Sequence, residues 1–127
     1  MLITIDLDSQ HFEDLRATLI AILDLKMKLL RISKTRKGYH IVAWCDLAIA
    51  KDFSIYDIDD KDVRELIRQR MNHKFYDSIK EKGERSHLIR YLLGDDPYRI
   101  IYDIIRKDVM PEQVLFNKHF KYYKYRR

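Results

Sequence analysis

The sequence has a single cysteine, two prolines, three glycines and one tryptophan among its 127 residues. Cys45 alone cannot form an internal disulfide, so a reducing compartment, the cytoplasm, is expected. No hydrophobic run approaches the roughly 18 residues that a membrane-spanning helix needs. The N-terminal segment up to Asp6 lacks the basic and apolar regions of a signal peptide. We therefore expect neither secretion nor contact with a membrane.

Hydrophobic residues make up 46% of the chain and charged residues 35%, proportions typical of a globular domain. The scarcity of glycine and proline, together with abundant Lys, Ile and Tyr, indicates short loops and is a composition found in proteins from hot environments. No linker or repeat divides the chain. We expect one domain over residues 1–120, followed by a basic aromatic tail over residues 121–127.

The formal net charge of +5 is concentrated near the C-terminus, because residues 118–127 carry five cations and no acid. Aromatic residues alternate with these cations, a composition suited to contact with a nucleic-acid backbone and to stacking on bases. The alternative is a frayed terminus whose charge only aids solubility. The candidate nucleic-acid-binding residues of the tail are Lys121, Lys124, Arg126 and Arg127.

The spacing of hydrophobic residues predicts both strands and helices. Segments with strand-like patterns are 2–7, 28–33, 39–44 and 113–120. Segments with helical spacing are 10–25 after a Ser9 cap, a segment from Asp59 or Asp60 through Phe75, 87–93 before Gly94, and one that starts at Asp96-Pro97. The order β-α-β-β-(α)n-β is that of an α+β, ferredoxin-like or RRM-like fold. It predicts a four-stranded antiparallel sheet with helices on one face and the other face open.

Side chains alternate between the two faces of a strand, so Asp6 and Asp8 are expected on the open face. The first and third strands are neighbours in this topology, which brings His40 beside the aspartates. Two carboxylates this close are costly unless a cation neutralises them, and Mg²⁺ or Mn²⁺ can do so. The alternative is that Asp8 only begins a helix turn and that Asp6 is a solvated strand residue.

Trp44 is expected on the same face as His40, where its ring could stack a base. A core or interface position is the alternative for this tryptophan. The hairpin turn carries Lys34, Arg36 and Lys37, which could guide a polyphosphate or simply form a solvated tip. Gly38 at the end of the turn is free to adopt a positive φ.

Two segments resemble the first two motifs of the archaeo-eukaryotic primase superfamily. Residues 3–8 read ITIDLD, an apolar strand that ends in D-x-D, and residues 33–42 read SKTRKGYHIV, a basic turn that leads to an apolar-flanked histidine. The resemblance covers about the first third of the chain and implies an RRM-like catalytic core. It also implies that Asp6 and Asp8 hold divalent metals and that His40 contacts the phosphates of the incoming nucleotide.

The family takes a third carboxylate from a later strand, where this chain offers Asn117. The implied catalytic residues are therefore Asp6, Asp8 and His40, and the implied ligands of Mg²⁺ or Mn²⁺ are Asp6, Asp8 and Asn117. An amide adds no charge to such a site. A core of this size resembles one that an archaeal virus or plasmid could carry, which would place a viral protein in the host cytoplasm.

Three functional hypotheses follow from the sequence. The first is a primase-like nucleotidyltransferase that acts in replication. The second is a non-catalytic module that binds DNA or RNA on the same fold. The third is a small viral protein that binds another protein, or forms a homodimer, through the open face of its sheet. Because the third carboxylate is missing, the sequence favours neither of the first two hypotheses strongly over the other.

Overall fold

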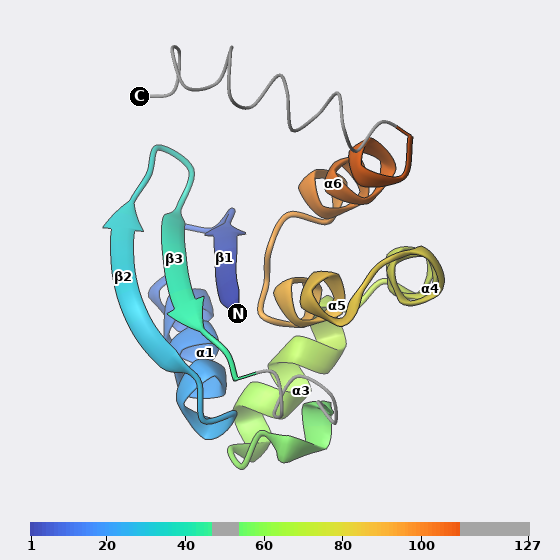
Figure 1. Cartoon of the computed structure of the whole chain (residues 1–127). Helices are drawn as coiled ribbons and strands as arrows, with labels where there is room; N and C mark the ends of the chain where they lie inside the picture. Colours follow the sequence, from blue (N-terminus) through green and yellow to red (C-terminus); the bar gives the residue numbers. More distant parts are fainter. Residues whose placement is uncertain (47–53, 110–127) are drawn as a thin grey trace.

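The computed structural model describes residues 1–46 and 54–109 (Figure 1). Three antiparallel strands form one sheet in the order β1-β3-β2. The strands are β1 (Leu2–Leu7), β2 (Lys28–Lys34) and β3 (Tyr39–Trp44), within one residue of the bounds predicted from the sequence. The register pairs Asp6 of β1 with His40 of β3, and Ser33 of β2 lies across from the same histidine.

Five α-helices and one short 3-10 helix complete the described part of the chain. They are α1 (Phe12–Asp24), η1 (Ile55–Asp57), α3 (Lys61–Arg70), α4 (His73–Lys82), α5 (Arg85–Leu92) and α6 (Pro97–Val109). Figure 1 shows α3 to α6 on the β1 side of the sheet, whereas β2 forms the opposite edge. None of the helices described is long and apolar enough to cross a membrane.

Capping residues explain several of the helix ends. The Asp60 carboxylate accepts the amides of Asp62 and Val63 at the start of α3. Gly94 follows α5 with a φ of 103°, a conformation that favours glycine. The predicted single helix through Phe75 is wrong, because α3 ends at Arg70 and a second helix, α4, begins at His73 with the side chain of Asn72 as its cap.

The first helix also starts later than predicted. It begins at Phe12, and its N-cap residue His11 makes no side-chain cap hydrogen bond. The Ser9 hydroxyl instead accepts the amide of His11 and donates to the carboxylate of Asp14. Ser9 therefore shapes the turn between β1 and α1 rather than capping the helix.

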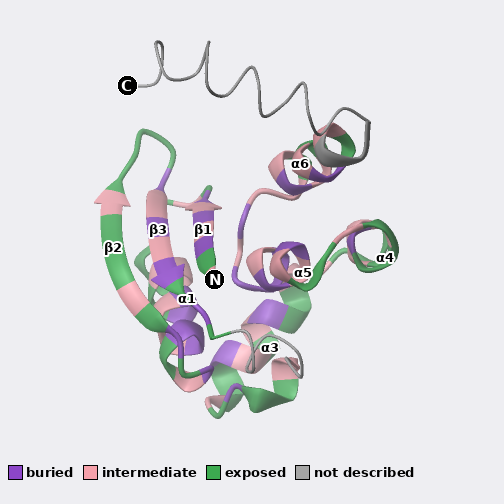
Figure 2. Ribbon diagram, in the orientation of Figure 1, coloured by how far each residue is buried: buried purple, intermediate pink, exposed green. Residues whose placement is uncertain are grey.

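The main core lies against one face of the sheet. Ile3, Ile5 and Leu7 alternate as buried residues along β1, as the sequence predicts, and pack with residues of α1, α3 and α5 (Figure 2). A smaller cluster joins α4, α5 and α6 through Ile79, Tyr91, Ile100 and Ile104. Burial of large aliphatic side chains is the main stabilising contribution to such a fold.

The predicted four-stranded sheet is wrong, because the described sheet has three strands. At the free edge of β1, where a further strand could pair, the connection between α5 and α6 lies instead. Leu7 forms a β-bridge with Asp95, and the Asp6 amide donates to Asp95 Oδ1 at 2.8 Å. The α+β class is correct. The predicted last strand, residues 113–120, lies outside the described residues, as does the tail.

An ion pair joins α1 to the end of α3. Arg70 Nη2 lies 3.0 Å from Asp14 Oδ1, and the exposed fractions of the two side chains are 23% and 25%. Burial acts to raise the pKa of the Asp14 carboxyl, but hydrogen bonds from Ser9 and Arg70 outweigh it, so this pKa is lowered.

Because its pKa is lowered on folding, Asp14 stabilises the protein above its unfolded-state pKa and loses that effect as pH falls through the folded-state value. We expect Asp14→Asn to cost about 1–2 kcal/mol near neutral pH and progressively less below pH 3.8. Urea unfolding over a pH series measures this difference, with Asp77→Asn on exposed α4 as the matched control. A cost that stays constant down to the acid limit would contradict the assignment.

Candidate functional site

One face of the sheet is left largely uncovered by the described helices, and we call it the open face. The strand register shows which residues lie on this face. They are Leu2, Thr4 and Asp6 of β1, His40, Val42 and Trp44 of β3, and Lys28, Arg31 and Ser33 of β2. The face therefore combines apolar, acidic and basic side chains.

The structure brings Asp6 and His40 together on the open face, at the end of the sheet next to the hairpin. His40 Nδ1 lies 2.6 Å from Asp6 Oδ1, and the exposed fractions of the two side chains are 36% and 43%. The sequence predicts this proximity from strand alternation alone. Asp8 lies just beyond β1, is exposed, and does not take part in this contact.

Arg99 of α6 is a further member of this site that the sequence analysis missed. Its Nη1 lies 3.1 Å from Asp6 Oδ2, and its Nη2 donates to Thr4 Oγ1 at 3.0 Å. Arg99 thus forms an ion pair with one oxygen of the Asp6 carboxylate, and His40 forms a hydrogen bond with the other. The only sequence signal for Arg99 was its i,i+4 spacing from Asp95, and that spacing does not reveal that α6 reaches over β1.

Asp95 connects this site to the helices. Its side chain is fully buried, and its Oδ1 accepts the backbone amides of Asp6 and Asp96 as well as Arg99 Nη1 at 2.8 Å. Its Oδ2 accepts Arg90 Nε at 2.7 Å. Burial raises the pKa of the Asp95 carboxyl, although Arg99, the Asp6 amide and Arg90 oppose the shift.

The described residues do not fit a two-metal site. Both oxygens of Asp6 already face cationic or ring nitrogens, from His40 and Arg99. Within residues 1–46 and 54–109, no three His, Cys, Asp or Glu side chains form a group that could hold a metal ion. Asn117 lies outside the described residues. The Mg²⁺ or Mn²⁺ site therefore stays a prediction.

Trp44 lies at one end of the open face. Half of its surface is exposed (50%), and Leu2, the residue of β1 that pairs with it, is 56% exposed. Lys28 of β2 is directly opposite Trp44, and Arg31 is opposite Val42. Large apolar side chains are usually withdrawn from water, so this pair beside two cations is a candidate contact surface.

The basic hairpin lies at the other end of the sheet. Lys34, Arg36 and Lys37 are all exposed there. The turn is held by the Thr35 amide, which donates to Gly38 O at 2.8 Å, and by Gln10, which donates to Arg36 O at 2.9 Å. The predicted hairpin cations are therefore displayed on an anchored turn. The tail residues Lys121, Lys124, Arg126 and Arg127 lie outside the described residues.

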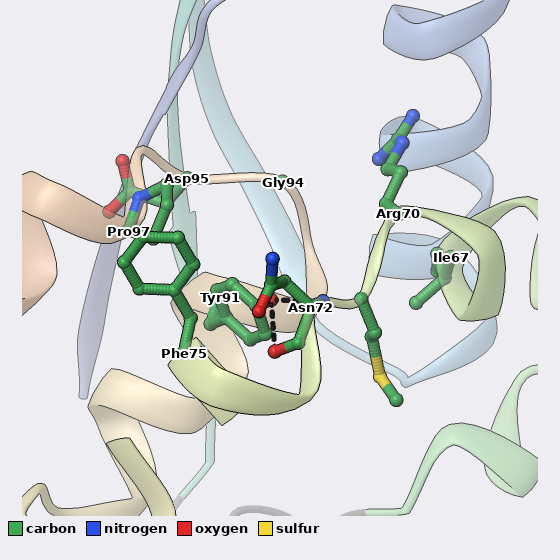
Figure 3. A pocket seen from close by; sticks show the side chains of 9 residues that line it. Ile67, Arg70, Asn72, Phe75, Tyr91, Gly94, Asp95 and Pro97 are labelled. Carbon is green, nitrogen blue, oxygen red and sulfur yellow. Dashed lines mark hydrogen bonds between the residues drawn. The ribbon is translucent and has the colours of Figure 1, made fainter. Parts of the chain in front are cut away.

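In the described part of the chain, two hollows adjoin the α5–α6 connection and lie away from the open face. One of about 260 Å³ is formed where α3, α4 and α5 meet the α5–α6 connection (Figure 3). The Tyr91 hydroxyl accepts the amide of Asn72 and donates to its carbonyl at the wall of this hollow. The other hollow, of about 470 Å³, is lined by Asp8, Asp14 and Arg70 among others. Neither contains His40 or Trp44.

Comparisons with models of protein families, with curated proteins and with solved structures yield no match to this chain.

Proposed function

We propose that the chain binds single-stranded nucleic acid on the open face of its sheet. The supporting observation is the placement of Trp44, a half-exposed indole, directly opposite Lys28 and close to Arg31. Proteins that bind single strands combine an aromatic platform for bases with cations for the backbone, and stacking is tolerant of sequence because every base has a π-face. A basic hairpin at the far end of the same sheet extends the cationic surface.

Trp44→Ala is expected to weaken binding of a fluorescein-labelled oligonucleotide by about 1–3 kcal/mol, that is, roughly 5-fold to 150-fold in Kd. Anisotropy titration measures this change for DNA and RNA oligonucleotides alike. Tyr56→Ala is the matched control, because Tyr56 is 67% exposed on η1 and lies outside the open face. Equal affinity of Trp44→Ala and the unmodified protein would contradict the proposal.

The second candidate is a metal-dependent nucleotidyltransferase, favoured by the proximity of Asp6 and His40 together with the motif resemblance. It requires Asp6 to exchange Arg99 for a metal ion. Primer extension in the presence of Mn²⁺ tests this activity. The expected result is incorporation that disappears in Asp6→Asn, and an absence of incorporation by the unmodified protein removes this candidate.

A further inference from the structure

We infer that a bound single strand runs lengthwise along β2, with its phosphates on the cations of that strand and its bases over β3. This inference rests on the proposed function and adds to it the direction of the ligand on the sheet. The competing path crosses the strands from β2 over β3 to β1 and reaches α6.

A β-bulge gives β2 its cationic open side. Lys28 and Arg31 are three residues apart, so regular alternation would place them on opposite faces. The register shift between Leu29 and Arg31 changes this, because Lys28 pairs with Trp44 and Arg31 pairs with Val42 on the same face. The bulge therefore aligns two cations along one side of the open face.

Lys28 and Arg31 form the cationic side of the open face. β2 carries no acid, and these two cations lie roughly 10 Å apart for a rise of about 3.3 Å per residue. Lys34 pairs with Tyr39 and lies on the opposite face of the sheet, whereas Arg36 and Lys37 extend the series into the hairpin. Among the residues described, neither Lys28 nor Arg31 forms an ion pair with an acid, and Arg31 Nε donates only to Ser33 Oγ at 3.1 Å. Both cations can therefore contact phosphates.

The β1 side of the open face is unsuited to phosphates. Asp6 and Asp8 lie at the end of this strand, and the nearby cation Arg99 is already engaged by Thr4, Asp6 and Asp95. A path across β1 would bring phosphates against the carboxylates of Asp6 and Asp8, beside an arginine that is already paired. The charge distribution thus favours the β2 side.

The edge position of β2 provides the space that this path needs. β2 is the outer strand in the order β1-β3-β2 and is exposed along most of its length (Figure 2). Its seven residues extend roughly 23 Å, which suits a binding site at the short end of the range of about 4–16 nucleotides known for single-strand binding folds. Bases directed inward from this edge meet Val42 and Trp44 of β3.

Salt-dependent titration of a labelled oligothymidylate with single-charge variants tests the path. Lys28→Gln and Arg31→Gln are each expected to raise Kd about fivefold and to reduce the slope of log K against log salt by about 0.7. Lys74→Gln on α4 is the matched control, because it removes one exposed cation far from the sheet. Circular dichroism confirms that each variant folds.

The outcomes separate this inference from the proposed function. A loss in Lys28→Gln and Arg31→Gln with no loss in Lys74→Gln supports the path along β2. Binding that is unaffected by Lys28→Gln and Arg31→Gln but lost in Arg106→Gln on α6 overturns the path and leaves the proposed function standing. An unmodified protein that does not bind the oligothymidylate or its RNA equivalent overturns both.

Discussion

Replacing Asp95 with alanine is expected to lower the free energy of unfolding by about 3–5 kcal/mol, because the change removes one partner from a buried charge network. The Asp95 side chain is fully buried between Arg90 and Arg99 and also accepts the backbone amides of Asp6 and Asp96. Alanine would leave two guanidinium groups and two amides without their shared acceptor. An unsatisfied buried donor costs far more than the net value of the bond it made.

Chemical denaturation measures this loss, and the isosteric Asp95→Asn distinguishes charge from shape. Asparagine keeps an acceptor oxygen for the amides but places an NH₂ group or a neutral oxygen against Arg90, so an intermediate loss is expected. Asp77→Ala on exposed α4 is the control, with an expected effect within about 0.5 kcal/mol. A loss below about 1 kcal/mol in Asp95→Ala would show that Asp95 does not organise the β1 edge.

Gly38→Ala is expected to destabilise the protein by about 1–3 kcal/mol or more, through backbone crowding. A Cβ atom at this position would overlap the carbonyl oxygen of Leu7 and would lie 2.7 Å from that of Ser9. Both neighbours are backbone, so the hairpin has to move away from β1. Positive φ is not the reason for this glycine, contrary to the expectation from the sequence, because among the described glycines only Gly94 has it.

Thermal unfolding measures the Gly38→Ala effect, and oligonucleotide binding reports its consequence for the hairpin. Displacement of the turn would shift Arg36 and Lys37 and weaken binding in parallel with stability. Gly83→Ala is a useful comparison, since the added Cβ would also approach a backbone carbonyl, that of Ile79, at 2.8 Å. Gly83 lies in the connection between α4 and α5, away from the hairpin. Unchanged stability of Gly38→Ala would contradict the close approach of the hairpin to β1.

The sequence could predict the strands because the hydrophobic alternation of Ile3, Ile5 and Leu7 has a single physical solution, burial of one face. The same alternation placed Asp6 and His40 on the other face. The sequence could not predict that Arg99 and Asp95 are further partners of Asp6, because the position of α6 and of the connection before it depends on how α5 and α6 pack. A cation was expected beside Asp6, and the guanidinium of Arg99 lies there in the structure.

The absence of a fourth strand from the described sheet has a related explanation. A strand edge needs partners for its backbone groups, and local spacing cannot show whether another strand or a side chain supplies them. At the β1 edge the carboxylate of Asp95 accepts the Asp6 amide. The bulge in β2 was equally hidden, because the segment KLLRISK contains no glycine or proline to mark it. Because of this bulge, Lys28 and Arg31 lie on the same face of the sheet.

Quenching of tryptophan fluorescence by a single-stranded oligonucleotide tests the central claim most directly. Trp44 is the only tryptophan in the chain, so its emission reports on the open face without interference from other sites. We expect a saturable decrease in emission that salt reverses and that an oligonucleotide duplex reproduces only weakly. Emission that stays unchanged while the oligonucleotide binds would place the ligand elsewhere and contradict the proposed function of the open face.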